Sequence, residues 1–551
     1  MSAKRVLMTM AALTASAWAD LTPDQKEFDM RVLAASYARN YAPAEWKKQV
    51  FGFDIFDIAD WVRRARESKD DLEFWEICAE YVASLRDSHS SFSIPSLFQA
   101  SLGFTADLYG DKPVIDAISR SVLPAARYPF GRGWEVVSVD GAPAEETIAR
   151  LSRFVYMAND RSRRRVAASY LGFRPQSRFP RAHEIGAEAV VVVKSPAGEE
   201  QTYTIPWRKS GTPATSAGKL PSPVAPRESR ADAPEDAPSL TDYTRDIVES
   251  PGEVNGVGSR TPIYALPAGF QMRQGRLSSD VFLSGVYLSG DLRIGLIRIP
   301  NFAPSSTSAA LRTFEGEIQF MQENTDGLVV DITRNNGGDA CYNEEIQRRL
   351  IPYEFRGIGR EIRLTTRFLI SFSNELEAAR ARSADPESIA QLEARLAEYV
   401  QAFREGRPRT GPLAVCAGTL QRQPAAVVYT KPVLTLIDEF SISAADGFAA
   451  VMQDARRGKL FGWRTNGAGG TTGSFPATVY SEAFASHTIA MHNRREPIVT
   501  NELPTAPYVE NIGVRPDILY DLMTLDELNN DFRWYVIAFT EAISEMIRAG
   551  R

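Results

Sequence analysis

Two nearly continuous apolar runs in the C-terminal half most constrain what this chain can fold into. They span residues 327–333 and 432–437, and each runs into a turn of small or polar residues. A strand that is apolar along its whole length must be covered on both faces, as in a largely parallel sheet between helices. Because parallel strands end at the same edge of a sheet, both turns are expected to face one crevice.

The sequence pattern of the rest of the chain changes at clear boundaries. Residues 22–87 repeat apolar side chains at helical spacing, and residues 97–207 form short β-rich runs separated by Gly and Pro. Residues 209–260 are rich in Ser, Pro, Ala and charge, and this composition cannot offset the entropy of ordering it. We therefore predict a disordered or loosely attached linker there.

A charged stretch interrupts the C-terminal half. Residues 372–416 are expected to form a helical insertion, because residues 375–407 are rich in Ala, Glu and Arg. The insertion is a candidate lid over the crevice or a dimer contact, so a homodimer is one expected assembly. Its amphipathic texture fits an ordinary surface helix equally well.

The N-terminus and the charge balance bear on location and partners. Lys4 and Arg5, a short apolar run and the sequence Ala17-Trp18-Ala19 form the three parts of a signal peptide. Cleavage after Ala19 predicts a periplasmic or secreted protein with no integral membrane segment. The 551 residues carry a net charge of −6, which does not favour nucleic-acid binding.

Cysteine usage excludes a disulfide scaffold. The chain has three cysteines, Cys78, Cys341 and Cys416, and none lies in a CxxC or Cys/His array. One bridge between Cys341 and Cys416 is conceivable, although the sequence does not decide it. No metal or cofactor is expected.

Ser443 lies where the second apolar strand gives way to a helix that begins at about Ala444. A serine at such a junction projects its hydroxyl at the edge of the sheet, next to the free amides of the helix N-terminus. The same residue type is also a common helix cap, so this position alone does not define a nucleophile. In the other turn, Gly337 and Gly338 allow a ligand to approach the backbone closely.

Histidine is scarce, and one histidine follows the N-terminal helices. Of the four histidines in the chain, His89 comes directly after Ser88 in a segment rich in serine. A histidine near a helix end is usually a cap or a surface residue. Its neutral imidazole is also a suitable base for a serine hydroxyl near neutral pH.

Four segments together resemble the C-terminal processing (tail-specific) serine protease family. They are Ser88-His89, 134–141, 334–338 and 440–454, in the order that the family has them. Together with the sequence patterns described above, the resemblance predicts an α/β multidomain protein. Its expected parts are a signal peptide (1–19), an N-terminal helical domain (20–95), a PDZ-like domain (96–208), the linker (209–260), a ClpP/crotonase-like protease core (261–525) and a C-terminal helix (526–551).

The resemblance also implies roles for single residues. It makes Ser443 the expected nucleophile and places the oxyanion amides at Gly337 or Gly338 with Ala444. The better-known members pair their serine with a lysine in a Gly-Lys-Gly motif, but here that position holds Ala468, which excludes the dyad.

Lysine-free branches of the same family offer another arrangement. The tricorn-protease core and the chlamydial protease-like activity factor use Ser, His and Glu, with an extra Ser beside the His. This resemblance implies His89 as the general base, supported by Ser88 and Glu510, with Glu502 as the alternative carboxylate.

The leading interpretation is a serine endopeptidase that hydrolyses polypeptides through an acyl-enzyme. The alternative is a catalytically inactive relative that binds a peptide or an apolar ligand, since the family contains a retinoid-binding protein. An esterase is disfavoured because no Gly-x-Ser-x-Gly elbow surrounds Ser443.

Overall fold

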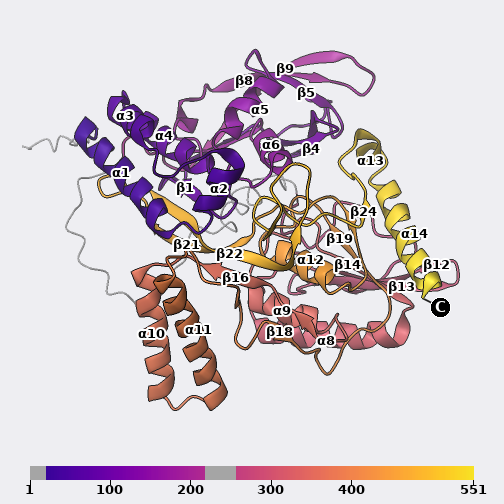
Figure 1. The fold of residues 1–551 in the computed structure, drawn as a ribbon. Coiled ribbons are helices and arrows are strands. Elements are labelled where there is room, and N and C mark those ends of the chain that lie inside the picture. Colours follow the sequence, from indigo (N-terminus) through magenta and orange to yellow (C-terminus); the bar gives the residue numbers. More distant parts are fainter. Residues whose placement is uncertain (1–19, 218–255, 551) are drawn as a thin grey trace, which may run out of the picture.

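The computed structural model describes residues 20–217 and 256–550 (Figure 1). The predicted signal peptide and the centre of the predicted linker lie outside these residues. The prediction of disorder is wrong for the start of the linker, because β10 (Arg208–Ser210) pairs with β2 (Gln99–Ser101). The amide of Ala217 also donates to Oδ2 of Asp71 (2.8 Å). These hydrogen bonds attach residues 208–217 to the rest of the fold.

Helices make up the N-terminal part of the described chain. They are α1 (Pro23–Asn40), α2 (Ala44–Phe51), α3 (Ala59–Glu67) and α4 (Asp71–Ala83). Thr22 begins α1 with a capping box that includes Gln25, and the Asp70 side chain caps α4. Ser88 and His89 lie in the turn that connects α4 to β1 (Ser91–Ser93).

The β-rich region that follows forms two sheets and two helices. The larger sheet has the order β3-β4-β5-β8-β9, with β6 beside β5, and the smaller one has the order β10-β2-β7. Within the larger sheet, β5 and β8 are antiparallel neighbours. The elements are β3 (Phe104–Tyr109), β4 (Lys112–Ile118), β5 (Glu135–Val139), β6 (Ala142–Pro143), α5 (Ala144–Ser152), α6 (Asp160–Ser169), β7 (Phe173–Pro175), η1 (Ala182–Glu184), β8 (Glu188–Lys194) and β9 (Glu200–Pro206).

The C-terminal half is built on the expected α/β sheet, and this confirms the predicted fold class. Its seven strands have the order β11-β12-β13-β14-β19-β20-β24, and they are parallel from β13 onward. The two apolar runs of the sequence are β14 and β19, which lie side by side. The strands are β11 (Gln271–Gln274), β12 (Leu283–Ser289), β13 (Leu292–Arg298), β14 (Gly327–Asp331), β19 (Val433–Ile437), β20 (Lys459–Gly462) and β24 (Ile518–Leu519).

Helices cover both faces of this sheet, as its apolar strands require (Figure 1). Leu328 and Val330 of β14 pack with α8, α9 and α12, whereas Val329 packs with α14 on the other face. This alternation follows from the period of two along a strand. The helices are α8 (Thr307–Asn324), α9 (Ala340–Arg348), α12 (Ala444–Asp454), α13 (Leu525–Asn529) and α14 (Arg533–Ala549).

A long strand, β22 (Phe484–Ile498), joins the N-terminal helices to the core. It pairs with β1, β16, β21 and β23, and β17 extends the sheet beyond β16. Because β1 directly follows His89, its pairing with β22 fixes that histidine against the C-terminal half. The remaining strands are β15 (Phe355–Arg356), β16 (Gly359–Ile362), β17 (Leu413–Ala414), β18 (Gln421–Arg422), β21 (Gly470–Pro476) and β23 (Ala506–Tyr508).

The helical insertion is a hairpin that projects from the body of the molecule (Figure 1). Its helices are α10 (Thr366–Ala381) and α11 (Pro386–Arg404). The hairpin begins before residue 372 because the Thr365 side chain caps α10 by accepting from the amide of Phe368. Cys341 of α9 and Cys416, which follows β17, form a disulfide with Cα atoms 5.5 Å apart, whereas Cys78 is free and buried. Within residues 20–217 and 256–550, every helix is too short or too polar to span a bilayer.

Candidate active site

Ser443 occupies a strained turn between β19 and α12. Its backbone has φ +60° and ψ −113°, a conformation that side-chain-bearing residues rarely adopt. Such strain costs about 1–3 kcal/mol and persists only where the surroundings enforce it. Here the amide of Ile442 donates to the carbonyl of Asn335 (2.9 Å), and the amide of Ser443 donates to Oδ2 of Asp446 (2.9 Å). The backbone at Ser443 therefore forms a sharp elbow, although the Gly-x-Ser-x-Gly motif is absent from the sequence around it.

The Ser443 hydroxyl meets the imidazole of His89. Oγ of Ser443 lies 2.8 Å from Nε2 of His89, although 354 positions separate the two residues. The His89 side chain is buried, and its backbone carbonyl accepts a hydrogen bond from the Ser486 hydroxyl of β22 (2.8 Å). The distance is within hydrogen-bond reach, as a nucleophile and its general base require.

The Gly337-Gly338 turn lies directly against Ser443. A Cβ on Gly337 would lie 2.7 Å from Cβ of Ser443, and φ of Gly337 is +91°. The amide of Gly337 donates to Oδ1 of Asn335 (2.8 Å), so it is not available to an oxyanion. Among the described residues, nothing accepts a hydrogen bond from the amides of Gly338 and Ala444. These two amides, and not that of Gly337, are free to bind a ligand.

Three charged side chains form a buried group beside His89, which we call the Asp87–Lys47–Glu510 cluster. Nζ of Lys47 lies 2.5 Å from Oε1 of Glu510, and both side chains are fully buried. Oε2 of Glu510 accepts from the amide of Gly469 (3.1 Å), and Oδ1 of Asp87 accepts from the amide of His89 (2.8 Å). Neither Lys47 nor Asp87 is predicted from the sequence, and for Asp87 the only signal is its place two residues before His89.

The hydrogen bond expected between His89 and a carboxylate is not formed. Nδ1 of His89 is buried and has no hydrogen-bond partner in the described structure. The Ser88 hydroxyl, expected to support His89, instead donates to Oδ1 of Asn466 (2.6 Å) and accepts from the amide of Ala158 (2.9 Å). Ser88 therefore ties the loop that carries His89 to the region before α6. Its position in the sequence gave no indication of these partners.

Of the two glutamates considered, only Glu510 belongs to the buried cluster. Glu502 is at the surface, where its carboxylate pairs with Arg515 (2.5 Å) and is 63% exposed. The Glu502 carboxylate therefore does not belong to the Asp87–Lys47–Glu510 cluster and is exposed to solvent.

Burial and nearby charges shift the pKa values of His89, Asp87 and Glu510. Burial lowers the pKa of His89, the charge of Lys47 adds to this effect, and the charge of Asp87 opposes it. Burial acts to raise the pKa of Asp87, but the charges of Lys47 and His89 and its hydrogen bonds outweigh burial and lower it. Burial and the charge of Asp87 raise the pKa of Glu510 to about 8. Asp87 is thus the carboxylate that keeps its charge near neutral pH.

The segment 465–470 takes the place of the lysine motif. Ala468 is fully buried, and its amide donates to Oδ2 of Asp446 (3.1 Å). Oδ1 of Asp446 also accepts from the Thr465 hydroxyl (2.5 Å) and the Gly467 amide (2.8 Å). Lys47 does not replace the missing lysine, because its ammonium donates to Glu510, Asn511 and a backbone carbonyl.

Comparisons with known proteins agree with this architecture. Residues 293–519 match the model of peptidase family S41, and residues 98–215 match a PDZ domain. The chain is 23% identical to a protein of Chlamydia trachomatis serovar D over 541 residues, which cover 87% of this chain and 85% of the relative. It is also 23% identical to a protein of Chlamydia pneumoniae over 576 residues, covering 94% and 90%.

Solved structures share the fold over nearly the whole chain. The crystal structure of mature CPAF superposes with a TM-score of 0.74 at 20% identity, covering 96% of this chain and 98% of that one. A structure of mature CPAF complexed with lactacystin gives the same TM-score at 19% identity, covering 96% and 99%. The resemblance to the tail-specific protease family is thereby confirmed. Residues 293–519 are a domain of peptidase family S41, a family of serine peptidases, and a PDZ domain precedes them in the chain.

Proposed function

We propose that this protein is a serine endopeptidase that cuts polypeptides through an acyl-enzyme, without a lysine base. The observation that carries the proposal is the 2.8 Å contact between Oγ of Ser443 and Nε2 of His89 at a strained strand-to-helix turn. A serine hydroxyl is a weak nucleophile, and an imidazole at this distance can take its proton.

The proposed reaction has two halves. Oγ of Ser443 attacks the carbonyl carbon of the scissile bond while Nε2 of His89 takes the hydroxyl proton. The amides of Gly338 and Ala444 hold the oxyanion, and His89 then gives its proton to the leaving amine. Water, activated by the same imidazole, hydrolyses the ester and restores the Ser443 hydroxyl.

Within the Asp87–Lys47–Glu510 cluster, Asp87 is assigned to stabilise the imidazolium that forms, because the charge of Lys47 acts against it. Asp87 supplies the negative charge that favours protonated His89. Glu510 belongs to the set as the carboxylate that holds Lys47 and the Gly469 amide in place. Its role is positioning, because its carboxylate does not contact the imidazole.

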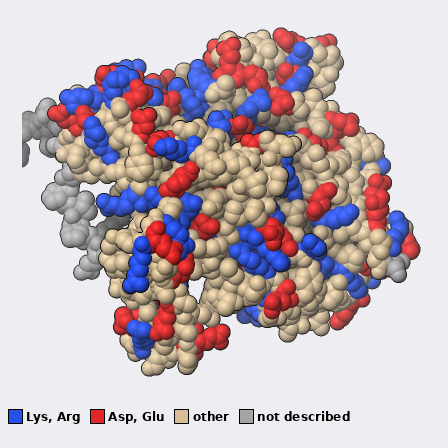
Figure 2. All heavy atoms as spheres, in the orientation of Figure 1, with Lys and Arg blue, Asp and Glu red and all other residues tan. Residues whose placement is uncertain are grey.

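The substrate class and the location complete the proposal. A PDZ domain adds an extended peptide to the edge of its sheet, which suits a polypeptide substrate. On the face shown in Figure 2, basic and acidic residues are interspersed. A nucleic-acid-binding face would instead gather its basic residues into one patch. The signal-peptide pattern favours action outside the cytoplasm, and the projecting hairpin remains a candidate dimer contact.

Hydrolysis of casein at neutral pH by the mature chain tests this function. Ser443→Ala and His89→Ala should each lower kcat/KM by at least about a thousandfold, because removal of either triad member leaves only residual catalysis. Ser441→Ala is the matched control, since its hydroxyl donates to the Ile332 carbonyl (2.8 Å) and does not contact His89. Circular dichroism confirms that each variant is folded. A parent without activity would favour the inactive binding relative.

A further inference from the structure

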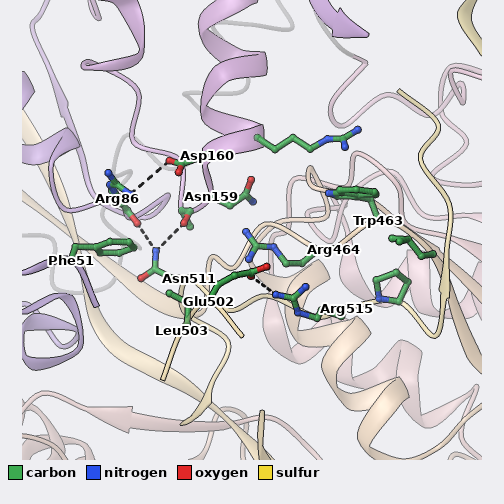
Figure 3. A pocket seen from close by; sticks show the side chains of 14 residues that line it. Phe51, Arg86, Asn159, Asp160, Trp463, Arg464, Glu502, Leu503, Asn511 and Arg515 are labelled. Carbon is green, nitrogen blue, oxygen red and sulfur yellow. Dashed lines mark hydrogen bonds and ion pairs between the residues drawn. The ribbon is translucent and has the colours of Figure 1, made fainter. Parts of the chain in front are cut away.

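A cavity distinct from the Ser443–His89 pair lies where three parts of the chain meet (Figure 3). Its volume is 660 Å³, within the range of about 300 to 1,000 Å³ typical of small-molecule sites. The N-terminal helices contribute Phe51, residues 158–161 precede and begin α6, and the core contributes segments around Trp463 and 502–519. Neither Ser443 nor His89 lines it.

The two ends of the cavity are built alike, each from a guanidinium stacked on an aromatic ring. The Arg86 guanidinium lies 4.7 Å from the centre of the Phe51 ring, and that of Arg161 lies 4.2 Å from the Trp463 ring. These stacks give the cavity flat apolar surfaces with positive charge behind them. Leu503 extends the apolar lining.

Most of the charges in the lining already have partners. Arg86 pairs with Asp160 (3.8 Å), and Arg515 pairs with Glu502 (2.5 Å). Arg161 is held by two carboxylates outside the lining, those of Glu439 and Asp521. The acidic groups of the lining are therefore matched, and they do not attract a cation.

The side-chain amides of the lining are also engaged. Asn511 donates to the carbonyls of Arg86 (2.8 Å) and Ala158 (3.0 Å), and its oxygen accepts from Lys47 (2.6 Å). Asn159 caps α6 through the amide of Ser162 (2.8 Å). These amides form the wall of the cavity but have little capacity left for a ligand.

Arg464 is the exception. Within the described residues its guanidinium makes no hydrogen bond and no ion pair, although most of the residue is shielded from solvent. Figure 3 draws it between Asn159, Trp463 and Arg515, without a dashed line to any of them. Burial lowers its pKa and the charge of Arg515 adds to this effect, whereas the charges of Glu502, Asp446 and Asp160 oppose it without outweighing it. A ligand carboxylate would offset both penalties.

We propose that this cavity is a binding site for organic carboxylates with an apolar or aromatic body, held by Arg464. The carboxylate pairs with the Arg464 guanidinium, and the body packs on the Phe51 and Trp463 rings. A free aromatic acid and a peptide that ends in an apolar residue present the same chemistry. The site goes beyond the proposed peptidase activity, and binding does not require catalysis.

Calorimetric titration of the full chain carrying Ser443→Ala tests the site without turnover. N-acetyl-phenylalanine should bind, and its neutral amide should bind at least about tenfold more weakly, because a charge-assisted pair is lost. A peptide that ends in phenylalanine, with a free or an amidated C-terminus, distinguishes a chain end from a small acid. Binding of the small acid alone assigns the site to small acids, and tighter binding of the free peptide assigns it to chain ends.

Variants of the two cavity arginines complete the test. Arg464→Gln should weaken binding of the acid by at least about tenfold. Arg515→Gln is the matched control and should weaken it less, since Arg515 already pairs with Glu502. Labelling of Ser443 by a fluorophosphonate in otherwise native Arg464→Gln protein checks that the serine site is intact. Equal binding of acid and amide, or unchanged binding by Arg464→Gln, would overturn the proposal even if the peptidase is active.

Discussion

Nζ of Lys47 lies 2.5 Å from Oε1 of Glu510, and neither side chain is exposed to solvent. The two residues are 463 positions apart, so the contact ties helix α2 to the segment that follows β23. Asp87 adds a second carboxylate that feels the charge of Lys47 and acts in turn on His89. The charge on the imidazole therefore depends on a buried balance between Lys47 and Asp87.

Removing Lys47 should destabilise the protein more than removing its exposed neighbour. Lys47→Met leaves the charged Asp87 carboxylate and the buried Glu510 carboxyl without their cation, and removing one partner of a buried charge pair costs about 3–5 kcal/mol. The double variant Lys47→Met/Glu510→Gln should recover part of that loss. Urea denaturation measures the free energies of unfolding.

The control for this prediction lies on the same helix. Lys48 pairs with Asp54, and its side chain is 65% exposed, so Lys48→Met should change stability little. A Lys47→Met protein as stable as Lys48→Met would show that the cluster is not a structural unit.

The pH dependence of stability should report the Glu510 carboxyl. The pKa of Glu510 in the folded protein is about 8, raised from 4.5. Its contribution to the free energy of unfolding is therefore fully present below pH 4.5 and is lost as the pH rises toward 8. Glu510→Gln removes this loss. The stability of the variant relative to the parent should thus increase between pH 5 and pH 8 in urea titrations, and a constant difference would contradict the shift.

The activity of the proposed peptidase should persist into mildly acid solution. Because burial holds the pKa of His89 below 6.5, the imidazole stays neutral to a lower pH than a free histidine. The acid limb of kcat/KM should therefore have its midpoint below pH 6.5. Asp87→Asn should move this midpoint lower still, since Asp87 opposes the shift, and a midpoint above 6.5 would refute the assignment.

The close approach of Gly337 to Ser443 predicts a severe effect of one methyl group. Gly337→Ala places Cβ 2.7 Å from Cβ of Ser443 and forces a side-chain residue to φ +91°. We expect kcat/KM on casein to fall at least about a hundredfold, as a small misplacement of a nucleophile does.

Gly141→Ala separates strain from contact. Gly141 has φ +77°, but a Cβ there would meet nothing within 4 Å. This variant should lose some stability and keep its kcat/KM. Equal loss of activity in both variants would mean that backbone strain, and not the contact with Ser443, is responsible.

Much of the fold could be predicted from local sequence. The apolar runs gave β14 and β19, and the junction after β19 gave a helix that begins at Ala444 with Ser443 before it. The start of α10 was misplaced because one cap, Thr365, decides it. Segment 209–217 was misjudged because the pairing partner of its first residues, β2, is about a hundred residues away.

The chemistry of the site was only partly predictable. Ser443 and His89 were found through their motifs, and the structure places them in contact. The partners of Glu510 and Ser88 were not found, because Lys47 and Asn466 belong to other elements and only the fold brings them close. A lysine in a helix is normally exposed, so its sequence context gave no sign of burial.

Covalent labelling of Ser443 measures whether this serine is a nucleophile activated by His89. The mature chain is treated with a fluorophosphonate at neutral pH, beside His89→Ala, and the adduct is located by peptide mass mapping. The account predicts one adduct, on Ser443, formed at least about a hundredfold more slowly without the His89 base. An adduct on another residue, no adduct in the parent, or equal rates in the two proteins would contradict it.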